Sequence, residues 1–283
     1  MLATLVIFLR ESIEASMIVA ILLAYLDRAG QRRHFRDVMV GVAAGIGLAG
    51  AGGIAAYLTI KTYAGSRAQS IFETVTFLLA AGVLTYMTFW MRSHSRSMSS
   101  ELRRRADAAL DRRARGGIAL LAFQAVGREG LETVVFTLAI VFATSPRGAL
   151  SGAAVGLAGG LAVAFAVYKL GHRINVGRFF RVVGALLMLF AAGLLVDAVE
   201  NLQQLGGLPV LTHPLWSTGA VLSESSVLGD LAHTFFGYAS SPSLLQVVVY
   251  VLYAVVAVGA FLGLERRSRR HVTVGRPPLP EGR

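Results

Sequence analysis

Long apolar stretches dominate the chain and restrict the folds that it can adopt. Of its 283 residues, 55% are hydrophobic and only 15% are charged. Several stretches are long enough to cross a hydrocarbon core of about 30 Å, where the backbone must satisfy its own hydrogen bonds and therefore forms helices. The sequence predicts an all-α membrane protein with seven transmembrane helices, at about 3–26, 38–60, 70–91, 117–142, 149–169, 179–200 and 244–264.

Basic residues follow the alternation that these spans impose. The segments that connect them on the opposite side hold few basic residues: Lys61, Arg67 and Arg147. An excess of Lys and Arg marks the cytoplasmic side. We therefore expect a multi-pass inner (plasma) membrane protein with its N-terminus outside and its C-terminus in the cytoplasm. The net charge of +11 then reports topology and not nucleic-acid binding. Most of the 27 Lys and Arg lie in 27–37, 92–115, 169–181 and the tail after 264.

Residue usage also excludes several classes of chemistry. The chain has no cysteine, so disulfides, thiolate metal sites and thiol catalysis are excluded. Its six histidines form no zinc-protease motif, and no nucleophile–base pair is apparent. We expect no enzyme and no permanently bound cofactor.

Two charged motifs of the form R-E-x-x-E interrupt the first and fourth apolar stretches. Glutamates three residues apart lie on nearly the same helix face, and the arginine can pair with the glutamate four residues on. Each charge at the bilayer centre costs roughly 2.5–3.5 kcal/mol, so a bound cation or a proton is expected to satisfy the glutamates left over. The motifs consist of Arg10, Glu11 and Glu14, and of Arg128, Glu129 and Glu132.

The two motifs belong to an internal repeat. Small residues recur every four positions in the second span, at Gly41 and Gly45, and in the fifth, at Gly152 and Gly156. Units of three spans must be inverted relative to each other, and such transporters bind substrate near the midplane. We expect a permease domain over 1–264 and a disordered cytoplasmic tail over 265–283. Within the permease domain we assign repeat A to about 1–92, repeat B to about 116–200, an extracytoplasmic loop to 201–243 and an additional C-terminal helix to 244–264.

An all-oxygen, carboxylate-rich site suits a hard cation. Iron(III), Mn²⁺, Mg²⁺ and Ca²⁺ all meet this description, so the donor atoms alone do not select the ion. Two other interpretations stay open. The Arg–Glu pairs can serve only to join helices, or the glutamates can relay protons without binding metal.

The paired motifs resemble those of the oxidase-dependent iron transporter family, which includes the fungal high-affinity iron permease and the iron permease of the bacterial Efe system. The segments Met87–Arg92 and Phe236–Tyr238 also resemble bacterial members. The resemblance implies that iron (Fe³⁺ or Fe²⁺) is the transported ion. It implies an extracytoplasmic oxidase or cupredoxin-like protein as the partner that delivers it. The residues that it implies contact iron are Glu11, Glu14, Glu129 and Glu132.

Further acidic residues lie near the predicted outer ends of the spans. Asp197 and Glu200 form a candidate entry site, to which Glu73 could contribute. The loop 201–243 could collect a cation or dock the partner, and 92–115 is expected to be a solvated cytoplasmic helix. Our hypothesis is an inner-membrane iron permease. The alternative is a proton-coupled transporter of another cation or small solute. The loop carries His213, Glu224, Asp230 and His233.

Overall fold

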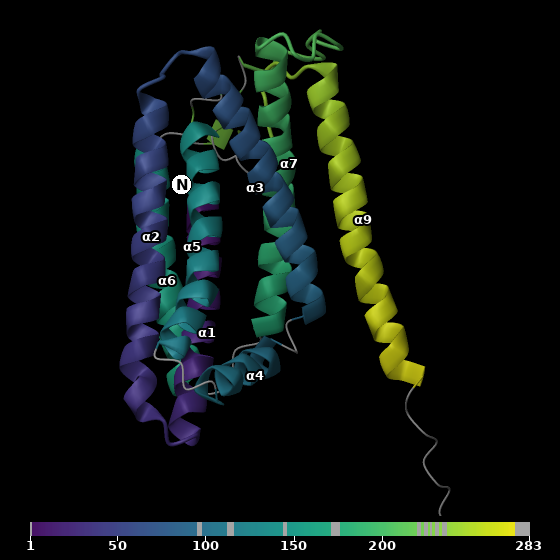
Figure 1. Ribbon diagram of the computed structural model, residues 1–283. Helices are drawn as coiled ribbons and strands as arrows, with labels where there is room; N and C mark the ends of the chain where they lie inside the picture. Colours follow the sequence, from purple (N-terminus) through teal and green to yellow (C-terminus); the bar gives the residue numbers. More distant parts are fainter. Residues whose placement is uncertain are drawn as a thin grey trace, which may run out of the picture.

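The computed structural model is built from long helices (Figure 1). It describes residues 2–94, 98–111, 116–143, 146–170, 176–219, 222–223, 226, 228–229, 232–233 and 237–274. In these residues the only β-structure is an isolated bridge between Pro214 and Ser243. The helices are α1 (Leu2–Arg28), α2 (Phe35–Lys61), α3 (Arg67–His94), α4 (Met98–Asp111), α5 (Gly117–Ala143), α6 (Pro146–Leu170), α7 (Val176–Gln204) and α9 (Leu244–Val274), with a 3₁₀ turn at Arg32–His34.

Each of the predicted apolar stretches lies within one of these helices, which confirms an all-α membrane-type protein for the described residues. Within the described residues, four segments are long and apolar enough to cross a membrane: Arg32–Lys61, Arg67–Met91, Gly148–Phe165 and Val182–Gln204. The motif helices α1 and α5 each carry a cluster of three charged residues. Composition alone therefore does not identify them as spans.

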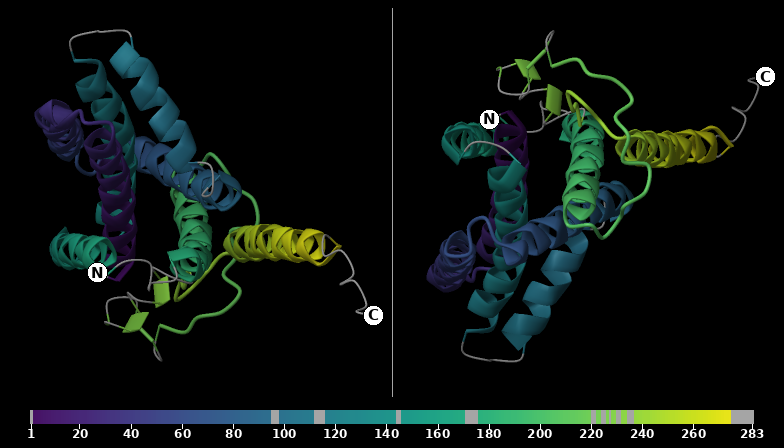
Figure 2. Two further views of the ribbon diagram at one scale, coloured as in Figure 1. Left: turned by 90° about the horizontal axis from the view of Figure 1, so that it is seen from below. Right: turned by 90° about the horizontal axis from the view of Figure 1, so that it is seen from above.

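The helices pack in pairs that exchange partners between the two halves of the chain. α1, the first helix of one half, packs on α6, the second helix of the other. In the same way α5 packs on α2, while α1 contacts α5 and α3 packs on α7. α9 stands at one side of the bundle against α7 (Figure 2). Two motif helices are thus held against each other by helices from opposite halves.

Small residues allow this close approach. A Cβ atom added to Gly45 of α2 would lie 3.0 Å from the backbone nitrogen of Gly127 in α5. A Cβ atom added to Gly160 of α6 would lie 2.5 Å from the Cβ of Ser12 in α1. The small-residue spacing in both stretches therefore marks tight helix contacts, as such patterns usually do in membranes.

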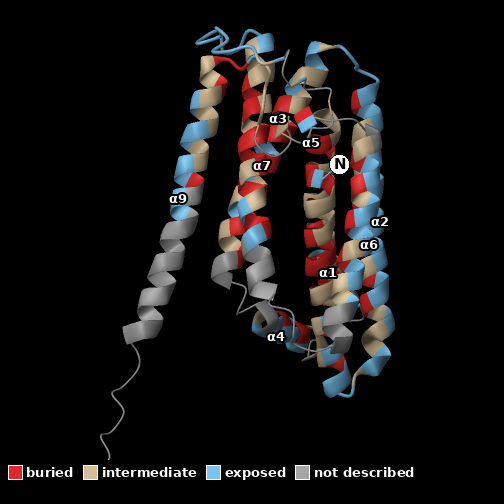
Figure 3. Ribbon diagram, turned by 180° about the vertical axis from the view of Figure 1, so that it is seen from behind, coloured by how far each residue is buried: buried red, intermediate tan, exposed pale blue. Residues whose placement is uncertain are grey.

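Two buried apolar clusters each include residues of both α1 and α5; buried positions are red in Figure 3. One joins Ile7 of α1 to Phe136 and Ile140 of α5. The other joins Leu22 of α1 to Ile118 of α5. Because the start of α1 meets the end of α5, the two helices run antiparallel. The charged motifs fall between the clusters.

Two segments differ from the sequence prediction. α4 is a helix, as expected within 92–115, but it is not fully solvated: Leu102 and Ala106 are buried against α1 and α5. It lies crosswise under one end of the bundle (Figure 1). α9 continues to Val274, whereas residues 265–274 were expected to be disordered. No glycine or proline occurs there before Gly275, so the helix has no strong signal to stop. Residues 275–283 lie outside the described residues.

Candidate carboxylate site

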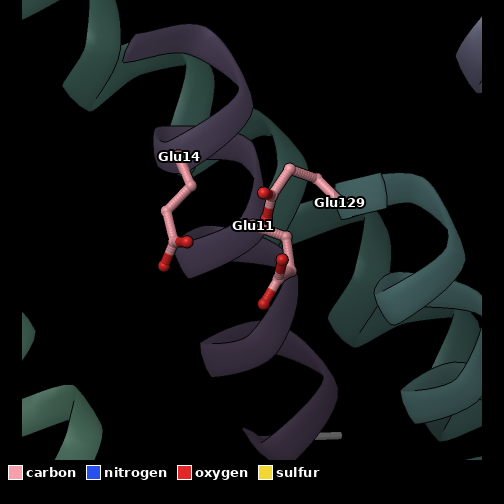
Figure 4. A group of neighbouring side chains, drawn as sticks. All are labelled: Glu11, Glu14 and Glu129. Atoms are coloured by element: carbon pink, nitrogen blue, oxygen red, sulfur yellow. The ribbon is translucent and has the colours of Figure 1, made fainter. Parts of the chain in front are cut away.

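The antiparallel contact between α1 and α5 brings the two motifs to one depth. Carboxylate oxygens of Glu11, Glu14 and Glu129 all lie within 4.8 Å of one another, and all three residues are buried (Figure 4). We call these three residues the glutamate cluster. Hard cations bind oxygen at about 2.0–2.6 Å, so oxygens sharing one ion lie up to ~5 Å apart. The spacing in the cluster is therefore that of potential ligands to a single ion.

Arg10 lies within the cluster and is almost completely buried. Its side chain is 3% exposed, and its Nε lies 2.7 Å from Oε1 of Glu14. Its Nη1 donates to Oε1 of Glu11 at 3.1 Å. Its Nη2 points at α3, where it donates to the sulfur atoms of Met87 at 3.5 Å and Met91 at 3.2 Å. One guanidinium thus neutralises part of the charge of both glutamates on its own helix.

Arg128 occupies a different environment, although its motif has the same pattern. Its side chain is 44% exposed, and its Nε donates to Oε1 of Glu132 at 2.9 Å. The same nitrogen lies 3.9 Å from Glu129. The guanidinium carbon lies 5.0 Å from the ring centroid of Trp90 on α3, which is a cation–π distance. Glu129 therefore has a weaker ion pair than the glutamates on α1.

Several carboxylate oxygens in the motifs are buried without a hydrogen-bond donor. They are Oε2 of Glu11, Oε2 of Glu129 and Oε2 of Glu132. A buried acceptor without a partner costs about 1–3 kcal/mol, and more when it is charged. A bound cation or a proton removes that cost. The site therefore has unused capacity for a positive ion.

Glu132 does not belong to the group of three. Its side chain is 14% exposed, and one of its oxygens is paired with Arg128, which also lies over Trp90. The intrahelical pairs expected from the spacing, Arg10 with Glu14 and Arg128 with Glu132, are both present. The expected four-glutamate arrangement is thus a compact group of three with Glu132 beside it.

The acidic residues predicted near the outer end have separate surroundings. Asp197 lies 3.4 Å from Nε2 of His233. Glu200 accepts hydrogen bonds from Gln204 at 3.1 Å and from Gln246 of α9 at 3.3 Å. Glu200, His233 and Gln246 line a pocket of about 320 Å³.

Of the described outer residues, Glu73 and His213 do not line this pocket. Glu73 accepts a hydrogen bond from Gln69 at 2.7 Å, one turn back on α3. His213 lies in the loop, where its carbonyl oxygen accepts the amide of Leu244. Glu224, Asp230 and Phe236 lie outside the described residues.

Sequence reasoning missed the contribution of α3. Met87, Trp90 and Met91 contact the two arginines, and no role in the site was predicted for them. Their spacing over one helical turn places them on one side of α3. That signal was available, but a Met and Trp stripe is more often ordinary core. Only the packing of α3 beside both motifs reveals the contact.

Comparisons with known proteins agree with the chemistry of the carboxylate site. The family model described as the iron permease FTR1 family matches residues 1–267. Ferrous iron permease EfeU of Escherichia coli is 34% identical over 264 residues, covering 93% of this chain and 95% of that protein. The proteins of the same name from Shigella sonnei and Yersinia pestis are also 34% identical, covering 92% of this chain and 95% and 93% of their own lengths. No solved structure matches. The chain belongs to the iron permease FTR1 family.

Proposed function

We propose that this protein moves iron inward across the inner membrane through the glutamate cluster. The observation that carries the proposal is the convergence of three buried carboxylates from two R-E-x-x-E helices, with oxygens that lack donors. The relatives are named ferrous iron permeases, which supports iron as the ion. In this proposal Glu11, Glu14 and Glu129 contact the ion directly. Glu132 joins them when Arg128 releases it.

The charge of the motifs favours a divalent ion. Four glutamates and two arginines leave two net negative charges when all are ionised. One Fe²⁺ neutralises them, and so do two protons when the site is empty. A neutral loaded site lowers the cost of holding ions inside the membrane. Exchange of the ion against protons therefore follows naturally from this composition.

The proposal includes an architecture of seven spans, with an inverted 3+3 repeat and α9 as the additional helix. The exchange of partners between halves supports it. In both cases the first helix of one repeat packs on the second helix of the other: α1 on α6, and α5 on α2. The distribution of basic residues supports an outer N-terminus and a cytoplasmic C-terminus. In this orientation α4 lies on the cytoplasmic side.

Entry from outside is assigned to the end of the bundle that carries the pocket. Glu200 lines the pocket, Asp197 lies one turn earlier on α7, and Glu73 lies in the second turn of α3 at the same end. The loop 201–243 contains no Lys or Arg, which suits a docking surface for an iron-delivering oxidase or cupredoxin-like protein. We expect that partner to hand iron to this acidic end; an oxidase would deliver Fe³⁺, which leaves the ionised motifs with a net charge of +1 instead of neutral.

Uptake of radiolabelled iron into proteoliposomes tests the proposal. Glu11→Gln and Glu129→Gln should abolish uptake, while the exposed Glu101→Gln on α4 should leave it unchanged. Uptake should resist a hundredfold excess of Mg²⁺, because that ion gives up its water reluctantly. Normal iron uptake by correctly folded Glu11→Gln and Glu129→Gln would overturn the proposal. Equal transport of a metal-free solute driven by a proton gradient would favour the proton-coupled alternative.

A further inference from the structure

One face of α5 near the cluster is uncovered. Leu120 is 55% exposed, Leu131 is 60% exposed, and Gln124 and Arg128 are also exposed. These four residues, spaced at about one turn, define what we call the exposed face of α5. It begins near the α4 end of the helix and reaches the level of Glu129. Two of its four members are polar.

Three of the four equivalent positions on α1 are buried or half-buried, and the fourth, Leu2, which aligns with Leu120, is 37% exposed. The motif registers align Arg128 with Arg10, Leu131 with Ile13 and Gln124 with Val6. Arg10 and Ile13 are buried and Val6 is half-buried. The exposure is therefore a property of α5 and not of the motif itself.

The depth of Arg128 decides what its exposed side can face. Arg128 lies near the middle of α5, about 16 Å from the helix start at a rise of about 1.5 Å per residue. A charged group at that depth in lipid is costly, and such groups face water or the interior of a bundle. Arg128 bonds to Glu132 and lies over Trp90, and 44% of its side chain stays exposed. Hydration of the exposed face of α5 would meet this requirement.

Straight routes along the α1–α5 contact are closed at both ends. Ile7 and Phe136 are fully buried on one side of the cluster. Leu22 and Ile118 are buried on the other side. An ion leaving between α1 and α5 would have to cross one of these dry clusters. The exposed face of α5 bypasses both.

We propose that the glutamate cluster exchanges its cation with water along the exposed face of α5, and that Trp90 is a positioning residue that holds Arg128 across this route. The inference rests on the proposed function for the identity of the ion. The guanidinium, held between Trp90 and Glu132, lies between the hydrated face and Glu129. Its withdrawal opens the cluster and frees Glu132 as a ligand. The route leads toward α4 and, in the proposed orientation, to the cytoplasm.

Cysteine labelling tests the hydrated face directly, because the natural chain has no cysteine. Gln124→Cys and Leu131→Cys should react rapidly with a charged, membrane-impermeant thiol reagent. Ile13→Cys, the matched position in α1, should react at least about tenfold more slowly because it is buried. Arg104→Cys on α4 and Thr62→Cys at the opposite end calibrate the side of the membrane. Reaction of Gln124→Cys and Leu131→Cys from the Arg104 side supports the proposal.

The same experiment can overturn the hydrated route. Slow reaction at Leu131→Cys and Gln124→Cys, equal to that at Ile13→Cys, would mean that lipid or a second copy of the chain covers this face. Reaction only from the Thr62 side would reverse the direction of the route. Labelling requires no transport, so these outcomes are separate from a failure of iron uptake.

A second experiment isolates the role of Trp90. Glu129→Cys, behind Arg128, should be labelled slowly when Trp90 is present. Trp90→Leu should accelerate that labelling about three- to tenfold, the range expected for loss of one cation–π contact, and Trp90→Phe should have a smaller effect. A merely structural role would lower protein yield in both variants without changing the labelling rate. An unchanged rate in well-folded Trp90→Leu would exclude the positioning role.

Discussion

Two copies of one motif have different surroundings in this protein. On α1 the arginine is sealed among two glutamates and two methionine sulfurs. On α5 it bonds to one glutamate, rests on Trp90 and stays 44% exposed. A buried guanidinium with four partners is a fixed countercharge, whereas a half-exposed one with few partners can move. We infer that Arg10 builds the site and that Arg128 controls access to it.

Removing each arginine gives the largest expected difference between the two copies. Arg10→Leu should lower the free energy of unfolding by about 3–5 kcal/mol, because it leaves buried glutamates without their countercharge. Arg128→Leu should cost about 1 kcal/mol or less, since water already screens its pairs. Denaturant unfolding in detergent micelles measures both. Equal losses would remove the proposed division of roles.

Replacing single glutamates by glutamine compares the two motifs by their effect on iron uptake. Glu132→Gln should weaken iron uptake about tenfold, because it holds Arg128 and is not part of the group of three. Glu11→Gln should have a larger effect, to the detection limit, because it removes a member of the cluster. Initial uptake rates at several iron concentrations test this order. A stronger effect from Glu132→Gln would place that residue among the primary ligands.

Glycine substitutions test whether the two copies are held equally tightly. Gly41→Ala puts a Cβ atom 2.2 Å from the carbonyl oxygen of Ala119, and Gly160→Ala puts one 2.5 Å from Ser12. Each should destabilise the protein by about 1–3 kcal/mol through overpacking. Gly47→Ala, with no atom within 4 Å, should be neutral or slightly stabilising, because alanine favours helix. Thermal unfolding measures the three variants. Equal unfolding temperatures would contradict the close packing at Gly41 and Gly160.

The smallest effect is expected from the methionines that face Arg10. Met91→Leu keeps the volume of the side chain but removes a weak sulfur acceptor at 3.2 Å. It should cost less than about 1.5 kcal/mol. Met87→Leu should cost less than Met91→Leu, since its sulfur is farther from Arg10. Losses comparable to that of Arg10→Leu would mean that the thioethers are essential partners.

The sequence predicted the elements and the pairs that depend on local spacing. Apolar length predicted the positions of the long helices, and the motif spacing predicted Arg10 with Glu14 and Arg128 with Glu132. The difference between the two arginines was not predictable in this way. It depends on which side chains of α3 lie beside each motif, and that is a property of tertiary packing. The buried face of α4 was missed for the same reason. The continuation of α9 has a different cause, because the absence of Gly and Pro before Gly275 is a property of the sequence itself.

The exchange of partners between halves has a consequence for how the protein is made. The ribosome delivers α1 and α2 long before α6 and α5, the helices on which they finally pack. Until then the glycine faces of the early helices have no matching surface. Arg10, in contrast, has partners from the start, because Met87 and Met91 belong to the half that is already synthesised. The first-synthesised half can therefore provide contacts for Arg10 before the second half is made. The site is complete only after α5 has been synthesised and has packed against α1.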